Sequence, residues 1–113
     1  MTAEEFVSAV QKEILERNMN IYENLFKSIS AENVKDTRLR MILLAYNTMN
    51  EEQRNAFFLM SKQVLIDTIS CLFGILDGTS LVDNFRDNFF LSYGPNPEKL
   101  NGDLQDYFLS NQD

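Results

Sequence analysis

The stretch from Asn50 to Gly78 constrains the fold more than any other, because it holds a helix start, a long apolar stripe and a helix stop in one run. Asn50 can cap the first turn, and Glu51 and Glu52 place carboxylates at the positive end of the helix dipole. Gly78 suits the left-handed position that ends many helices. We therefore predict one long core helix that ends at Asp77. Its predicted buried stripe is Phe57, Ser61, Val64, Leu65, Thr68, Leu72 and Leu76, widened by Phe58, Ile69 and Phe73.

Two helices are predicted before it. Thr2 and Glu5 have the spacing of a capping box, so a helix should start here. Apolar residues at steps of three, four and seven extend it to about seven turns, which the sequence RNMN at 17–20 could interrupt. A second helix of about four turns follows. The stripes are Val7, Val10, Ile14, Ile21, Leu25 and Ile29 in the first helix, and Val34, Arg38, Met41, Ile42, Ala45, Tyr46 and Met49 in the second.

Residues 80–93 fit either a helical or a strand period. The turn-prone pair Asp-Asn occurs at 83–84 and at 87–88, and aromatic residues are frequent, so two short strands are favoured, as an aromatic hairpin or extended segment. Asn96 and Pro97 then resemble a helix start. A short C-terminal helix should dock Leu104, Tyr107 and Phe108 on the core.

The length of 113 residues fits a single domain over 1–113, with frayed ends at 1–2 and 110–113. Hydrophobic residues make up 44% of the chain and aromatic residues 12%, as in globular proteins. The predicted fold is mainly α, with three principal helices packed as a small bundle, the aromatic segment and the C-terminal helix.

The charge is unevenly distributed. Residues 1–62 hold 8 basic and 9 acidic groups, whereas residues 63–113 hold 2 and 8, so most of the net charge of -7 lies in the second half. An acidic chain is a poor ligand for nucleic acid and for anionic membranes. The window Val64–Leu76 is short for a membrane span and contains Asp67. The chain opens MTAEEFVSAV, without a signal core, which predicts a cytoplasmic protein.

Histidine is absent from the sequence, which excludes histidine-dependent catalysis and histidine-ligated zinc. Cys71 lies among apolar residues and is predicted to be an inert core thiol. A carboxylate enzyme or a calcium site stays open, but the ligand order of an EF-hand is missing from DGTSLVDNFRDN. We therefore expect no enzyme, cofactor or metal. The carboxylate candidates are Asp77, Asp83, Asp87, Asp103 and Asp106.

A second role for these acids is protein binding. Asp67, Ser70 and Gly74 share the less apolar side of the long helix, which is either a solvated face or part of a surface for a basic partner. Aromatic residues surrounded by acids make effective interface centres, and Phe85, Phe90 and Tyr93 are candidates for exposure. The predicted partner-binding residues are Asp67, Asp77, Asp83, Phe85, Asp87, Tyr93, Asp103 and Asp106.

The order VLIDTISCLFGILDGTSL, FFLSYG and LNGDLQDYFLS resembles the C-terminal half of small acidic bacterial immunity proteins. The resemblance implies a cytoplasmic protein that binds and neutralises a toxin, and it fixes no binding residue. The net negative charge also favours toxin neutralisation, since an acidic domain suits inhibition of a basic enzyme such as a nuclease.

The alternative is a self-associating helical scaffold or regulatory protein without catalytic activity. The heptad-like stripe of the first helix could form its dimer seam, so both monomer and homodimer stay open. This possible seam consists of Val7, Val10, Ile14, Ile21 and Leu25.

Overall fold

The computed structural model describes residues 1–80, 82–84 and 87–112, and its described part is mainly helical, as predicted. No strand forms in these residues, where an isolated bridge joins Tyr93 and Asn96, so the predicted hairpin at 80–93 is not confirmed. The elements are α1 (Ala3–Val10), the π-helical η1 (Gln11–Glu16), α2 (Arg17–Ser28), the 3₁₀ turn η2 (Ala31–Asn33), α3 (Thr37–Asn47), α4 (Glu51–Asp77) and α5 (Leu104–Ser110).

The helix ends follow local signals. At α1, Thr2 Oγ1 accepts from the Glu5 amide at 3.1 Å. At α4, Asn50 and Gln53 form a reciprocal capping box of 2.8 and 2.9 Å, and Gly78 ends the helix with φ +81°. The start predicted for the second helix is wrong, because Asp36 caps α3 and the helix begins at Thr37.

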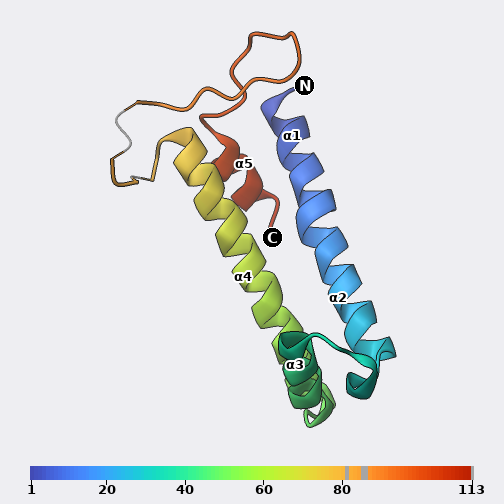
Figure 1. Ribbon diagram of the computed structural model, residues 1–113. Coiled ribbons are helices and arrows are strands. Elements are labelled where there is room, and N and C mark those ends of the chain that lie inside the picture. The colour runs from blue at the N-terminus through green and yellow to red at the C-terminus, as the bar shows by residue number, and fades with distance from the viewer. Residues whose placement is uncertain (81, 85–86, 113) are drawn as a thin grey trace.

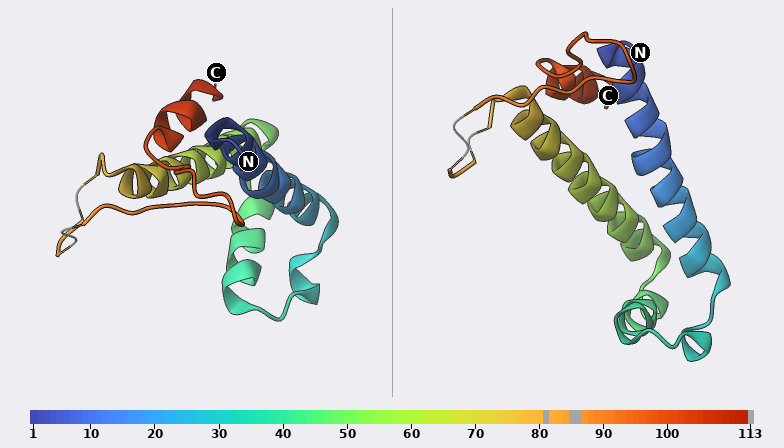
Figure 2. Two further views of the ribbon diagram at one scale, coloured as in Figure 1. Left: turned by 90° about the horizontal axis from the view of Figure 1, so that it is seen from above. Right: turned by 45° about the horizontal axis from the view of Figure 1, so that its top comes forward.

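The long helices form an open pair (Figure 1). α1, η1 and α2 continue as one rod that runs antiparallel to α4. α5 lies between the rod and α4 at one end, and α3 packs at the other end (Figures 1 and 2). Gln112, in the tail predicted to fray, donates to Gln11 Oε1 at 2.6 Å. The predicted packing of three helices as a small bundle is not confirmed.

Two apolar clusters hold the pair together. The first lies where α1, η1, α4 and α5 meet, and it includes Leu104 and Phe108, both fully buried as predicted for the C-terminal helix. That helix begins at Leu104, since Asn96 accepts from the Glu98 amide in a turn instead of capping a helix. The second cluster joins α2, α3 and α4 through the aromatic rings of Phe26, Tyr46, Phe57 and Phe58.

The π segment changes which face of the first helix is buried. The amide of Arg17 donates to the carbonyl of Lys12, five residues earlier, which adds one residue to that turn. The buried positions therefore move one residue along, to Leu15, Met19 and Phe26. The predicted stripe is correct at Val7, but Ile14, Ile21 and Ile29 are 43%, 49% and 37% exposed.

The predicted buried stripe of α4 is also only partly correct. Val64 is 53% exposed and Leu72 is 55% exposed, and Thr68 is exposed too. Cys71 is exposed as well, so the prediction of a core thiol is wrong. The side that α4 buries most deeply faces α1 and α5, and it consists of Ile69, Ser70, Phe73 and Gly74.

Candidate functional site

The Asp77 carboxylate caps a helix that lies 27 residues further along the chain. Its Oδ1 accepts from the amides of Gly102 (2.6 Å) and Leu104 (3.2 Å), and its Oδ2 accepts from the amide of Gln105 (2.8 Å). Asp103 holds the N-cap position of α5 but makes no capping bond there. Asp77 was predicted to bind a partner. Instead, both of its carboxylate oxygens accept hydrogen bonds from amides of the same chain, which stabilises the start of α5.

Asn101 is buried and ties the segment before α5 to the loop and to α4. Its Nδ2 donates to the carbonyls of Leu76 and Phe89, and its Oδ1 accepts from the Leu91 amide at 2.8 Å. The amide of Leu100 adds a bond to the Leu91 carbonyl. Asp77 and Asn101, named here the loop clamp, thus fix both ends of the connection between α4 and α5.

The less apolar side of α4 is the docking site of α5, which neither sequence alternative for this side anticipated. Gln105 Nε2 donates to Ser70 O and Ser70 Oγ at 3.1 Å, and Gln105 Oε1 accepts from Thr79 at 3.1 Å. A Cβ on Gly74 would lie 2.7 Å from Ser80 Oγ. Ser70 and Gly74 are therefore packing residues, and only the more distant Asp67 on this side is exposed.

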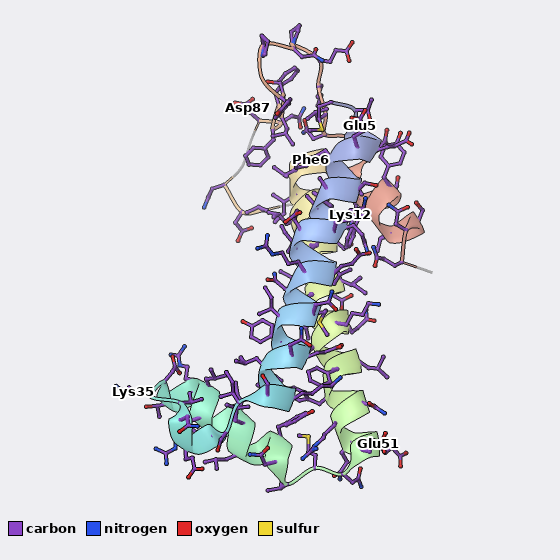
Figure 3. The ribbon with its side chains drawn as sticks, turned by 90° about the vertical axis from the view of Figure 1, so that its right-hand side faces the viewer. Glu5, Phe6, Lys12, Lys35, Glu51 and Asp87 are labelled. Carbon is purple, nitrogen blue, oxygen red and sulfur yellow. The ribbon has the colours of Figure 1, made fainter. Side chains whose placement is uncertain are left out.

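Several exposed carboxylates belong to segments that meet at one end of the molecule, namely the start of α1, the loop and α5 (Figure 1). Glu5 and Asp87 lie at this end in Figure 3, opposite the end that holds Lys35 and Glu51. In the described residues the only ion pair joins Arg17 and Glu13, so these carboxylates form none. We call this set the acidic end: Glu4, Glu5, Asp83, Asp87, Glu98, Asp103 and Asp106, all exposed.

The other predicted site residues lie in different places. Asp67 is exposed on α4, accepts from Gln63 at 2.9 Å, and lies about 15 Å along the helix from Asp77. Tyr93 is 61% exposed on the loop, and Phe90 is 64% exposed near it. Phe85 lies outside the described residues. Asp67 is therefore separate from the acidic end, whereas Tyr93 belongs to the same loop as its aspartates.

Sequence reasoning missed Glu4 and Glu5. They lie in the first turn of α1, where acidic residues stabilise the helix dipole, so nothing local pointed to a further role. They share an end with the second-half acids because α5 packs against α1. Only contacts between distant segments could reveal this grouping.

A second exposed surface lies along the long helices. In the rod, Ile14 and Ile21 are exposed on one side of the buried Leu15, and Glu16 lies on the other side. On α4, Val64 lies about 160° round the helix from Lys62. We call this surface the uncharged face: Ile14 and Ile21 of the rod with Met60, Val64, Thr68, Cys71 and Leu72 of α4, all exposed.

The opposite side of the pair is an open groove of about 1040 Å³ between the rod and α4. Its floor includes Met19 and Phe58. Acidic and basic side chains balance along its rim, so the groove has no net preference for a charged partner. The rim charges are Glu16, Glu23, Lys27, Glu51, Arg54 and Lys62, and no member of the uncharged face lines the groove.

No group of three or more Cys, Asp or Glu side chains in the described part of the chain could hold a metal ion. α4 is long and apolar enough to cross a membrane by length and composition, and 22% of its most apolar window is buried. No protein-family model, curated protein or solved structure matches the chain.

Proposed function

We propose that this chain is a non-catalytic protein-binding domain that covers a basic protein with its acidic end, in the manner of an immunity-type inhibitor. The observation that carries this proposal is the clamped loop. Residues 79–103 link α4 to α5 without a helix or strand in their described part, yet Asp77 and Asn101 fix the ends. Connections of this length within a domain are commonly functional.

A clamped loop is suited to binding because part of its ordering cost is met before the partner arrives. The loop exposes Phe90 and Tyr93, and it also carries the exposed Asp83 and Asp87. Aromatic side chains supply much of the affinity of interfaces, whereas charge speeds association and selects the partner. A basic enzyme with a phosphate-binding cleft, such as a nuclease toxin of the cytoplasm, is the partner that this combination fits.

The resemblance to immunity proteins supports the proposal in a limited way. Its matching segments contain Asp77, Asn101 and Gln105, which build the clamp and the α5 docking site. The resemblance therefore concerns residues that shape the loop, and the binding surface itself stays specific to each partner.

The test compares two charge-neutralised variants that carry the same net charge. Asp83→Asn with Asp87→Asn removes two loop carboxylates, and Glu16→Gln with Glu23→Gln removes two from the groove rim. Each tagged chain is used to capture proteins from the native host at low salt, with elution at high salt. We expect wild type and the groove variant to retain one basic enzyme in near-equal amount, and the loop variant to lose at least about tenfold of it.

The captured enzyme then provides the functional readout. Its expression alone should arrest growth, and co-expression of wild-type chain should restore growth, whereas the loop variant should restore it poorly. Equal capture by both variants, or a captured enzyme that the chain does not inhibit, would refute the proposal.

Self-association is a second candidate function, and the uncharged face favours it. The predicted seam on the first helix cannot form as proposed from sequence, because Val7 is fully buried. Ile14 and Ile21 stay exposed, but they share their surface with α4.

A further inference from the structure

We infer that the uncharged face is covered by a second copy of this chain, in an antiparallel two-fold dimer in which α4 packs along α4 of the partner subunit. This inference is independent of the proposed inhibitor function, because the acidic end and the uncharged face are different surfaces. Its basis is the surface area of the chain, the residue pattern of α4 and the satisfied hydroxyls on that helix.

The chain exposes more surface than a folded monomer of its size. Its accessible surface is 8450 Å², whereas about 6400 Å² is expected for 13.1 kDa. Its radius of gyration is 17.9 Å, against about 13 Å for a compact chain of this length. The excess of about 2000 Å² per chain exceeds the roughly 800 Å² per partner that a standard stable interface buries.

The open side of α4 carries a heptad pattern with no charge. Counting from Ser61, the steps to the following members are three, four, three and four residues, which keeps them on one side of the helix. The members are Ser61, Val64, Thr68, Cys71 and Ile75. Phe57, four residues before Ser61, packs in the second apolar cluster and is not part of this seam.

This pattern is self-complementary when the second helix runs in the opposite direction. A two-fold axis midway between Val64 and Thr68 places Ser61 opposite Cys71 of the partner subunit, and Val64 opposite Thr68 of the partner subunit. Isologous symmetry requires such reciprocal pairs. The central pairs combine small or β-branched side chains, which let two helices approach closely.

The two hydroxyl groups on the seam can be buried without losing a hydrogen bond. Thr68 Oγ1 donates to the carbonyl of Val64 at 2.7 Å, and Ser61 Oγ donates to the carbonyl of Phe57 at 2.9 Å. Each hydroxyl is therefore paired within its own helix, and a dry interface would leave neither donor unsatisfied.

A bilayer is a poorer occupant than a second copy. The middle of α4 exposes Lys62, Gln63 and Asp67, which would lie near the bilayer centre if the helix crossed a membrane. In the dimer Lys62 and Gln63 lie away from the seam, whereas Asp67 borders it, one helical turn from Val64 and Cys71.

The first experiment measures mass in solution by analytical ultracentrifugation at 1 to 100 μM chain. Wild type should sediment as a dimer of twice the 13.1 kDa chain mass. Val64→Lys should raise the dimer dissociation constant at least about a hundredfold, because it places a charge in each half of the seam. Leu59→Lys is the matched control, because Leu59 is 70% exposed and lines the groove. It should leave the dimer unchanged.

Three outcomes would overturn the inference. A wild-type monomer at 100 μM would leave the face unoccupied by a second copy. Dissociation by Leu59→Lys but not by Val64→Lys would place the contact in the groove. Flotation of wild type, but not Val64→Lys, with phosphatidylcholine vesicles would assign the face to a membrane.

The second experiment tests the register without placing a charge in the seam. Ser61→Cys should form a disulfide with Cys71 of the partner subunit under mild oxidation, giving a covalent dimer. Lys62→Cys, one residue away but on the groove side, should not. Wild type should not crosslink either, since its two Cys71 residues would lie about 15 Å apart along the helices. Wild-type crosslinking, or equal crosslinking of both variants, would overturn the antiparallel pairing.

Discussion

At the scale of single residues, Asp77 fills the capping role that the position of Asp103 predicts. Asp103 immediately precedes α5, where an aspartate normally caps a helix, yet its carboxylate makes no capping bond. Asp77, at the end of α4, accepts the amides of that first turn instead. The tertiary fold supplies the cap from a distant helix, and this couples the end of α4 to the start of α5.

Asp77→Asn should therefore lower the free energy of unfolding by about 1–2 kcal/mol, because the amide loses the negative charge and one acceptor oxygen. Asp103→Asn should change it by less than about 0.5 kcal/mol, as for other exposed surface sites. Urea denaturation followed by circular dichroism measures both. Similar losses in the two variants would show that the remote cap contributes little.

At the scale of secondary-structure elements, the π segment decides which apolar residues the rod buries. An uninterrupted α-helix would place Ile14 on the core side, but the additional residue in η1 places Leu15 there, 1% exposed. Ile14 and Ile21 then join the uncharged face. One inserted residue thus creates both the core contact and part of the exposed surface.

Leu15→Ala should cost about 2–5 kcal/mol, the usual range for emptying a fully buried leucine site. Ile14→Ala should cost less than about 1 kcal/mol, because its side chain is 43% exposed. Both are measured by urea denaturation in the Val64→Lys chain, so that association does not contribute. A reversed order of the two losses would contradict the π register.

At the scale of the whole molecule, the two exposed surfaces differ in charge and so should differ in their response to salt. The uncharged face contains no ionisable carboxylate or ammonium group, whereas the acidic end has several exposed carboxylates and, among described residues, no ion pair. A dimer and a complex with a basic protein could coexist, because the surfaces do not overlap.

Raising ionic strength from about 0.05 to 0.5 M shortens the Debye length about threefold and screens exposed charges. The dimer dissociation constant should change by less than about threefold, whereas association with the basic enzyme should slow by at least about tenfold. Ultracentrifugation and stopped-flow kinetics measure the two responses. A dimer that dissociates with salt would contradict an uncharged seam.

Both ends of α4 were predictable from sequence, because the deciding groups are neighbours in the chain. Asn50 and Gln53 are three residues apart, and Gly78 directly follows the helix that it ends, so both ends of α4 were predicted correctly. The acidic character of the second half was equally visible. At α3 the local signal was overlooked: Asp36 is a preferred N-cap residue and accepts from the Leu39 amide, but the apolar stripe was traced from Val34.

The sequence by itself therefore determined the mainly helical character, the start of α1, both ends of α4 and the charge of the chain, since these depend on groups within a few residues. The tertiary structure decided which faces are buried. Docking of α5 buried the Ser70 and Gly74 side of α4, and the π turn changed which side of the rod faces the core. Consequently Val64 and Leu72, predicted as core, stay exposed, because burial depends on segments that meet only when the chain folds.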